Sequence, residues 1–97
     1  MISDPKSLVI LNSEYEEAEQ AIKTYERVTL SAPIAAINQL RYAGFHILRS
    51  YCESDAVMSR QHVDKAIAHC TRAFYDAMEG VIYAQLEFLR DFQNCTA

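Results

Sequence analysis

The scarcity of glycine and proline is the feature of this sequence that most restricts its fold. The 97-residue chain contains two residues of each type, whereas average proteins contain about 7% glycine and 5% proline. Turn-rich sandwiches and barrels need these residues at their many chain reversals. With 51% hydrophobic and 23% charged residues, the composition is that of a folded domain rather than a disordered segment. We therefore predict a single all-α domain over residues 1–97.

Local start signals divide the chain into three predicted helices. Asp4 precedes Pro5, and Ser31 stands two residues before Pro33; both pairs combine a favourable N-cap residue with a proline that suits the first helical turn. Ser59 is the expected cap of the third helix. We expect helices at residues 5–29, 33–52 and 59–93. These three ranges together predict an antiparallel three-helix bundle with a long third helix.

Apolar and small residues at helical spacing define the expected core. The second helix is expected to expose the half that carries Gln39, His46 and Ser50. Its expected buried face consists of Ile34, Ile37, Leu40, Ala43, Ile47, Leu48 and Tyr51. In the third helix a seam of small residues, which two backbones can approach closely, comprises Ala66, Cys70, Ala73, Ala77, Gly80 and Ala84. We expect this seam to receive the first or the second helix of the same chain.

The third predicted helix is longer than the other two, and its C-terminal part stays apolar. At ~1.5 Å per residue it extends about 50 Å, against about 36 and 30 Å for the others. The side chains that the shorter helices would leave uncovered are Ile82, Leu86, Phe88, Leu89 and Phe92. Two more rings, Tyr42 and Phe45, interrupt the polar half of the second helix. We predict that these residues bind a partner, either a second copy of the chain or another helical protein.

Charge and cysteine content narrow the expected partners and compartment. The net charge of −4 weakly repels nucleic acid and anionic membranes, so neither is an expected partner. No apolar run approaches the ~18 residues of a spanning helix, and the first residues lack a signal-peptide pattern. Cys52, Cys70 and Cys95 have no paired short spacing, which favours reduced thiols in a cytoplasmic protein. Cys52 and Cys70 are expected in the core.

The sequence carries no pattern typical of a cofactor or metal site. His62 and His69 lie seven residues apart, about 10 Å along one helix, which is too far for them to share a metal ion. No strand-to-helix turn or glycine-rich loop accompanies the cysteines. We therefore expect no metal and no cofactor. A non-catalytic role is the favoured interpretation, and an enzymatic role stays open.

Two segments resemble the first two helices of HEPN domains. The first is the acidic, alanine-containing stretch at residues 15–21. The second follows the pattern A-x-N-x-x-x-Y-A-x-F-H, carried by Ala35 or Ala36, Asn38, Tyr42, Ala43, Phe45 and His46. The resemblance implies a helical bundle that dimerises and that serves in a bacterial toxin–antitoxin or phage-defence system. Some members of the family are metal-independent RNases, so the resemblance also implies this activity as an alternative.

The resemblance also implies the candidate catalytic residues, Arg41 and His46. In an RNase of this kind they would meet across a dimer, where His46 would transfer protons and Arg41 would stabilise the phosphate. However, the catalytic pair of the family comes from a later helix, and Tyr42 stands where RNase members carry a polar residue. The resemblance therefore implies a shortened, non-catalytic HEPN-like bundle.

Three functions follow from these features. The leading one is a non-catalytic helical module that self-associates or docks on a partner protein, in a bacterial defence or toxin–antitoxin system. The first alternative is the HEPN-type RNase that uses Arg41 and His46. The second is a small acidic inhibitor from a phage or mobile element, whose acidic first helix imitates nucleic acid.

Overall fold

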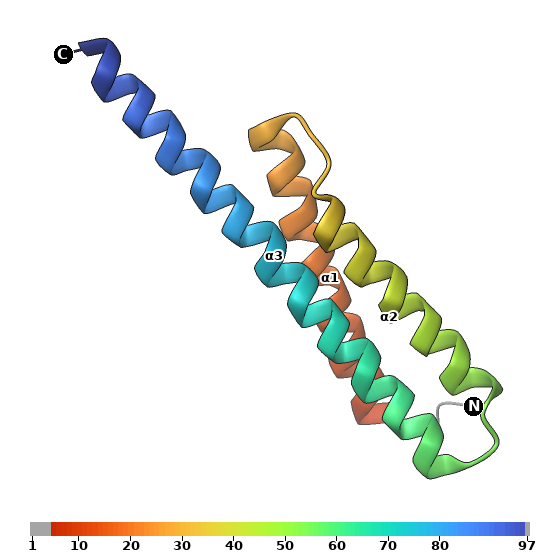
Figure 1. Ribbon diagram of the computed structural model, residues 1–97. Helices are drawn as coiled ribbons and strands as arrows, with labels where there is room; N and C mark the ends of the chain where they lie inside the picture. The colour runs from red at the N-terminus through yellow and green to blue at the C-terminus, as the bar shows by residue number, and fades with distance from the viewer. Residues whose placement is uncertain (1–4, 97) are drawn as a thin grey trace.

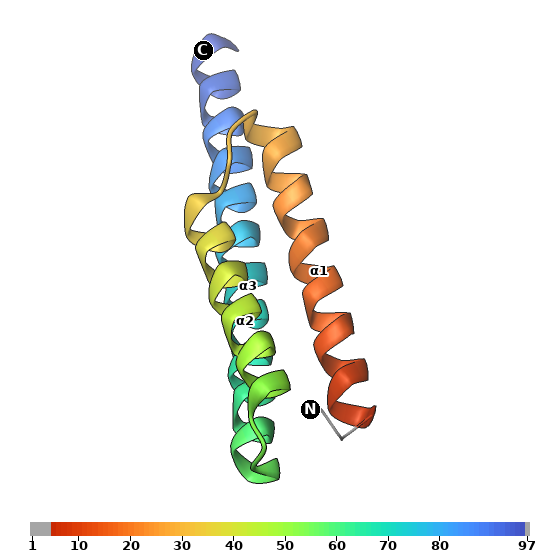
Figure 2. The ribbon, with the colours of Figure 1, turned by 90° about the vertical axis from the view of Figure 1, so that its right-hand side faces the viewer.

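Three α-helices form the part of the chain, residues 5–96, that the computed structural model describes (Figure 1). Helix α1 spans Pro5–Thr29, α2 spans Ile34–Cys52 and α3 spans Ala56–Thr96. Successive helices run in opposite directions, and α3 packs along both of the others (Figures 1 and 2). The all-α antiparallel bundle with a long third helix is thus confirmed.

The first two helices begin and end close to the predicted residues. Helix α1 begins at Pro5 as predicted, and its expected cap, Asp4, lies outside the described residues. Helix α2 begins one residue after Pro33, which occupies the cap position with φ −81° and ψ 85°. The chain reverses between them at Leu30, which has a left-handed φ of 58° and is 89% exposed. A tight reversal therefore joins α1 to α2 without glycine.

The predicted start of α3 at Ser59 is wrong. The helix begins three residues earlier, because the Asp55 carboxylate Oδ1 accepts the backbone N–H groups of Val57 and Met58 at 2.9 and 3.1 Å. An aspartate at this position satisfies donors that have no partner within the helix. Ser59 is buried one turn later, and its hydroxyl donates to the Ser50 carbonyl at 2.8 Å. At its other end α3 continues to Thr96, three residues beyond the predicted end.

We expect Asp55→Ala to destabilise the protein by about 1 kcal/mol, because two N–H groups at the start of α3 lose their acceptor. Chemical denaturation monitored by circular dichroism measures this loss. Ser54→Ala is the matched control at the neighbouring exposed position and is expected to change stability by less than about 0.5 kcal/mol. Equal losses from the two variants would contradict the cap.

Small side chains form the core where α3 meets the other helices. Ala66, Cys70, Ala73 and Ala77 of the predicted seam have no exposed surface. One buried cluster unites Ala18, Ala21, Ile22, Ala36, Ala73 and Ala77. The other unites Leu11, Ala43, Val63, Ala66 and Cys70. Both clusters contain residues from all three helices, so the seam receives α1 and α2 together, within one chain.

The predicted buried face of α2 is wrong at its edges. Three of its members are exposed by 66–70%, namely Ile34, Leu48 and Tyr51. Three residues of the predicted polar half are instead half-buried or buried, namely Gln39, His46 and Ser50. The physical reason is that α2 approaches α3 through the small residues Ala36 and Ala43, which have no exposed surface. The α2 residues that lie beside these two alanines on the side facing α3 are therefore buried or half-buried, whether they are apolar or polar.

Helix α3 extends beyond the end of the α1–α2 hairpin as a single helix (Figures 1 and 2). It passes through Gly80 without interruption. A side chain at Gly80 would clash with the ring of Tyr25, so the glycine permits the last turns of α1 to lie close against α3. The molecule is accordingly elongated, with principal extents of 64 × 21 × 16 Å.

Candidate functional site

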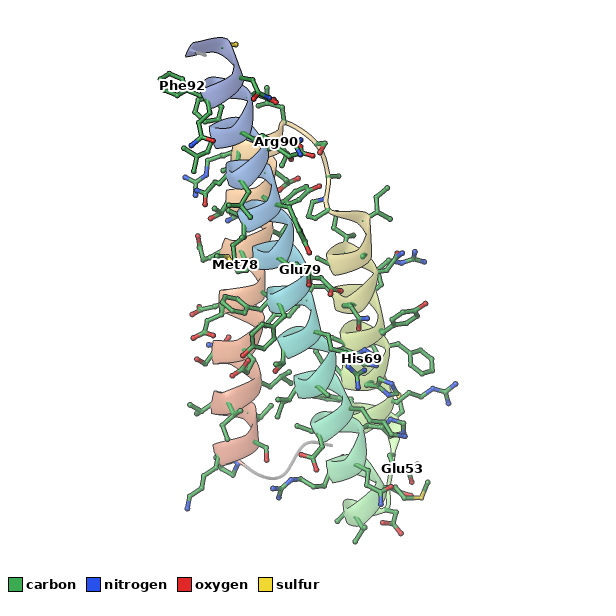
Figure 3. The ribbon with its side chains drawn as sticks, turned by 60° about the vertical axis from the view of Figure 1, so that its left-hand side comes forward. Glu53, His69, Met78, Glu79, Arg90 and Phe92 are labelled. Atoms are coloured by element: carbon green, nitrogen blue, oxygen red, sulfur yellow. The ribbon has the colours of Figure 1, made fainter. Side chains whose placement is uncertain are left out.

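The C-terminal apolar segment of α3 is the first candidate site, and it is exposed as predicted. We use this name for Ile82, Leu86, Phe88, Leu89 and Phe92, which are exposed by 53, 56, 70, 56 and 60%. Figure 3 shows Phe92 near the free end of α3. Five large apolar side chains that are each more than half exposed form an unusual surface for an isolated domain.

This segment has two faces, since residues on a helix are separated by ~100° around its axis. The inner face, Phe88 and Leu89, borders a groove at the end of α1 that Val28, Ala84 and Gln85 also line. The outer face, Ile82 and Leu86, borders a second groove on the adjoining flank of α3. Leu89 lies at the boundary between the two faces, ~20° from Ile82 around the helix axis. The inner face lies directly beside the end of α1, because Val28 lines the same groove.

The second candidate site is a histidine cluster between α2 and α3. His46 of α2 meets His62 of α3 with an Nδ1–Nδ1 distance of 3.0 Å. The ring of His69 stacks on that of His46, with centroids 5.4 Å apart and planes only 9° from parallel. His69 Nδ1 also lies 2.7 Å from Gln39 Oε1; because this oxygen only accepts, the His69 nitrogen donates. Figure 3 shows His69 on the side of α3 that faces α2.

The spacing of the histidines along a single helix did not indicate this cluster, because its members come from two helices. In an antiparallel hairpin, residues equally distant from the turn lie side by side. His46 and His62 are each eight residues from Ser54, and Gln39 and His69 are each fifteen residues from it. Counting outward from the Glu53–Asp55 turn would therefore have predicted both contacts.

The surroundings of His46 and His69 favour their neutral imidazoles. The pKa of His46 is lowered by burial, then by the charges of His69, His62 and Lys65. The pKa of His69 is lowered by burial and by the Arg72 guanidinium. Both effects penalise the protonated ring.

Tyr42 and Phe45, which were predicted to bind a partner, form the outer border of the histidine cluster. Their side chains are exposed by 55 and 50%. The Tyr42 ring lies 5.5 Å from that of His69, and the Phe45 ring lies edge-on to His46 at 5.3 Å. The Arg49 guanidinium sits 4.9 Å from the centre of the Phe45 ring, in a cation–π arrangement. Partner binding by these two rings stays a prediction.

Within one chain, the structure does not bring Arg41 and His46 together. They lie five residues apart on α2, which places them ~140° apart around the helix. The exposed Arg41 guanidinium donates to Asn38 Oδ1 at 3.3 Å, whereas His46 faces α3. Their joint action across two chains stays a prediction.

The cysteines differ from the prediction at one position. Cys70 is buried as expected, and burial, together with the nearby charge of Glu14, raises the pKa of its thiol to about 11. Such a thiol is not a nucleophile near neutral pH. Cys52 is exposed, so its expected place in the core is wrong, because it ends α2 beside the turn. Among residues 5–96, His, Cys, Asp and Glu side chains form no group of three that could hold a metal ion.

Comparison of the chain with protein-family models, curated proteins and solved structures gives no match. The HEPN resemblance therefore stays a prediction. None of the described helices is long and apolar enough to cross a membrane.

Proposed function

We propose that this chain is a helical interaction module that self-associates through the inner face of the C-terminal apolar segment. The observation that carries the proposal is the exposure of Phe88 and Leu89 beside the end of α1. Further down the bundle α1 covers the equivalent surface of α3. A helix from another molecule would extend that cover where α1 ends.

A second copy of the chain fits this surface best. The bundle ends in a step, where α3 projects beyond the α1–α2 hairpin (Figure 2), and two such steps are complementary when one molecule is inverted. A two-fold axis of this kind is the commonest symmetry of protein oligomers. If two α3 ends pair antiparallel about a point between Phe88 and Leu89, the inner face of each copy meets that of the other. Glu87 and Arg90 lie ~150° from the middle of this face and stay outside the contact.

The available area supports a dimer of modest affinity. A phenylalanine side chain buries ~150–250 Å², so the inner face with Phe92 and Val28 offers roughly 500 Å² per copy. Two copies would bury roughly 1,000 Å², close to the ~1,200 Å² at the lower end of stable interfaces. At ~25 cal/mol per Å² the transfer free energy of this area favours association, but the loss of translational and side-chain freedom cancels much of it. We therefore expect dimers at micromolar concentrations.

The double variant Phe88→Glu/Leu89→Glu is expected to weaken self-association by about 100-fold, because it places two carboxylates in the apolar contact. Sedimentation equilibrium measures the mass against that of the 11.1 kDa chain. Helix content should stay unchanged, since both side chains are exposed in the single chain.

The outer-face variant Ile82→Glu/Leu86→Glu is the matched control, with the same added charge on the same helix. It should still dimerise. Dimers that only the outer-face variant disrupts would contradict the proposed face. A wild-type chain that remains monomeric at high micromolar concentration would contradict self-association altogether.

A further inference from the structure

The side-chain hydrogen bonds that join α2 to α3 among the described residues include three pairs, two of which use an imidazole. The pairs are Ser50 with Ser59, His46 with His62, and Gln39 with His69. Helix α2 packs extensively on α3 and only slightly on α1. The attachment of α2 to the bundle therefore depends on this one seam.

His46 and His62 meet head-on. Their ring centroids are 5.3 Å apart, which exceeds the 3.0 Å between the two Nδ1 atoms by about the sum of the two ring radii. The nitrogens thus point at each other, and one must carry a hydrogen while the other presents its lone pair. The same alignment does not suit a shared metal ion, which needs two lone pairs that converge on one point.

The number of protons on this pair decides whether the hydrogen bond forms. Two neutral rings form it when one is protonated at Nδ1 and the other at Nε2. One added proton on the donor ring leaves the bond intact and adds charge to the donor. A second added proton must bind the acceptor Nδ1, where it removes the lone pair. Two N–H groups and two positive charges then lie against each other.

Charged groups of α3 oppose protonation of His46 and His69. On α3, the charges of Lys65 and His69 act on His46, and Arg72 acts on His69. On α2, the Arg49 guanidinium is engaged by the face of the Phe45 ring, which lies edge-on to His46. A positive charge on His69 repels one on His46 across a short distance, because the two rings stack with their centroids 5.4 Å apart.

We propose that His46, His62 and His69 form a proton-operated joint between α2 and α3, which is closed while His46 and His62 share one Nδ1 proton and opens in acid when both rings are charged. Opening would loosen α2 from the seam while α1 stays packed on α3. This device is independent of the proposed dimer contact, which lies at the other end of α3.

The direction of the pH effect follows from proton binding. The pKa of His46 in the folded protein lies below its ordinary value, so the unfolded chain binds more protons as the pH falls below about 6.5. The contribution of His46 to the free energy of unfolding is therefore fully present above that pH, and it is lost as the pH falls toward the folded-state pKa. Each unit by which folding lowers the pKa corresponds to a tenfold change in the ratio of folded to unfolded protein.

Denaturant unfolding at a series of pH values between about 8 and about 5.5 tests the joint, because Asp and Glu stay ionised over this range. We expect the ratio of folded to unfolded wild type to fall by about tenfold across it. The variant His46→Gln/His62→Gln replaces the rings with amides that can hydrogen-bond at any pH, so its acid loss should be much smaller than that of the wild type. The remaining loss comes from His69, whose pKa is lowered by burial and by Arg72. His69→Gln is the control, and it should retain most of the acid loss because the head-on pair remains.

Nuclear magnetic resonance titration of the wild-type histidines adds a measurement that needs no variant. The His46 ring should titrate below its ordinary value, and its ¹⁵N shifts should report an Nδ1 hydrogen bond before the titration. Wild-type stability that does not change between about pH 8 and about pH 5.5 would overturn the proposal. So would a His46 ring that titrates normally, or a double variant that loses as much stability in acid as the wild type.

Discussion

Replacing Ala73 with leucine is expected to destabilise the bundle by about 3 kcal/mol, at the upper end of the range for overpacked cores. Ala73 has no exposed surface and packs in one cluster with Ala18 and Ala21 of α1 and Ala36 of α2. A larger side chain at this point must push both neighbouring helices away from α3. Close-packed interiors accommodate such additions poorly.

Thermal and denaturant unfolding would measure the loss caused by Ala73→Leu. Ala35→Leu is the matched control, because Ala35 lies on the exposed side of α2; there the same addition should change stability by less than about 0.5 kcal/mol. If Ala73→Leu were as stable as the control, the close approach of the three helices at this level would be wrong.

The two glycines should respond to alanine with opposite signs. Both lie within helices, where alanine is favoured over glycine by about 1 kcal/mol. A Cβ at Gly44 meets nothing within 4 Å, so Gly44→Ala should stabilise the protein by about that amount. A Cβ at Gly80 would overlap the ring of Tyr25, and we expect Gly80→Ala to destabilise the protein by about 1 kcal/mol net of the helix gain.

A double-mutant cycle separates these two contributions at Gly80. In the Tyr25→Ala background the clash is absent, so Gly80→Ala should become stabilising by about 1 kcal/mol. Unfolding free energies of the four proteins in the cycle supply the measurement. A stabilising Gly80→Ala in the wild-type background would show that the Tyr25 ring moves aside at little cost.

The helices themselves could be predicted because their signals are local. Few glycines and prolines, and apolar spacing that continues unbroken through residues 59–93, fixed the number and order of helices. The start of α3 was misplaced because Asp55 and Ser59 are both good caps. Which of them acts as cap depends on Ser50, because its carbonyl engages the Ser59 hydroxyl across the helix pair.

The buried face of α2 could not be predicted from α2 alone. Its apolar residues outnumber those that α3 can cover, and the small residues Ala36 and Ala43 decide which side approaches α3. Once that side is set, His46 is placed opposite His62. The histidine cluster is therefore a consequence of helix pairing, and the pattern within either helix contains no sign of it.

The long projection of α3 affects how the molecule moves through a solution. A compact protein of this length has a radius of gyration of roughly 12–13 Å, whereas that of this chain is 17.1 Å. A single copy should therefore elute from a size-exclusion column ahead of compact standards of equal mass, at a volume that imitates a larger protein. Scattering intensity and sedimentation equilibrium, which depend on mass and not on shape, distinguish a rod-like monomer from two associated copies.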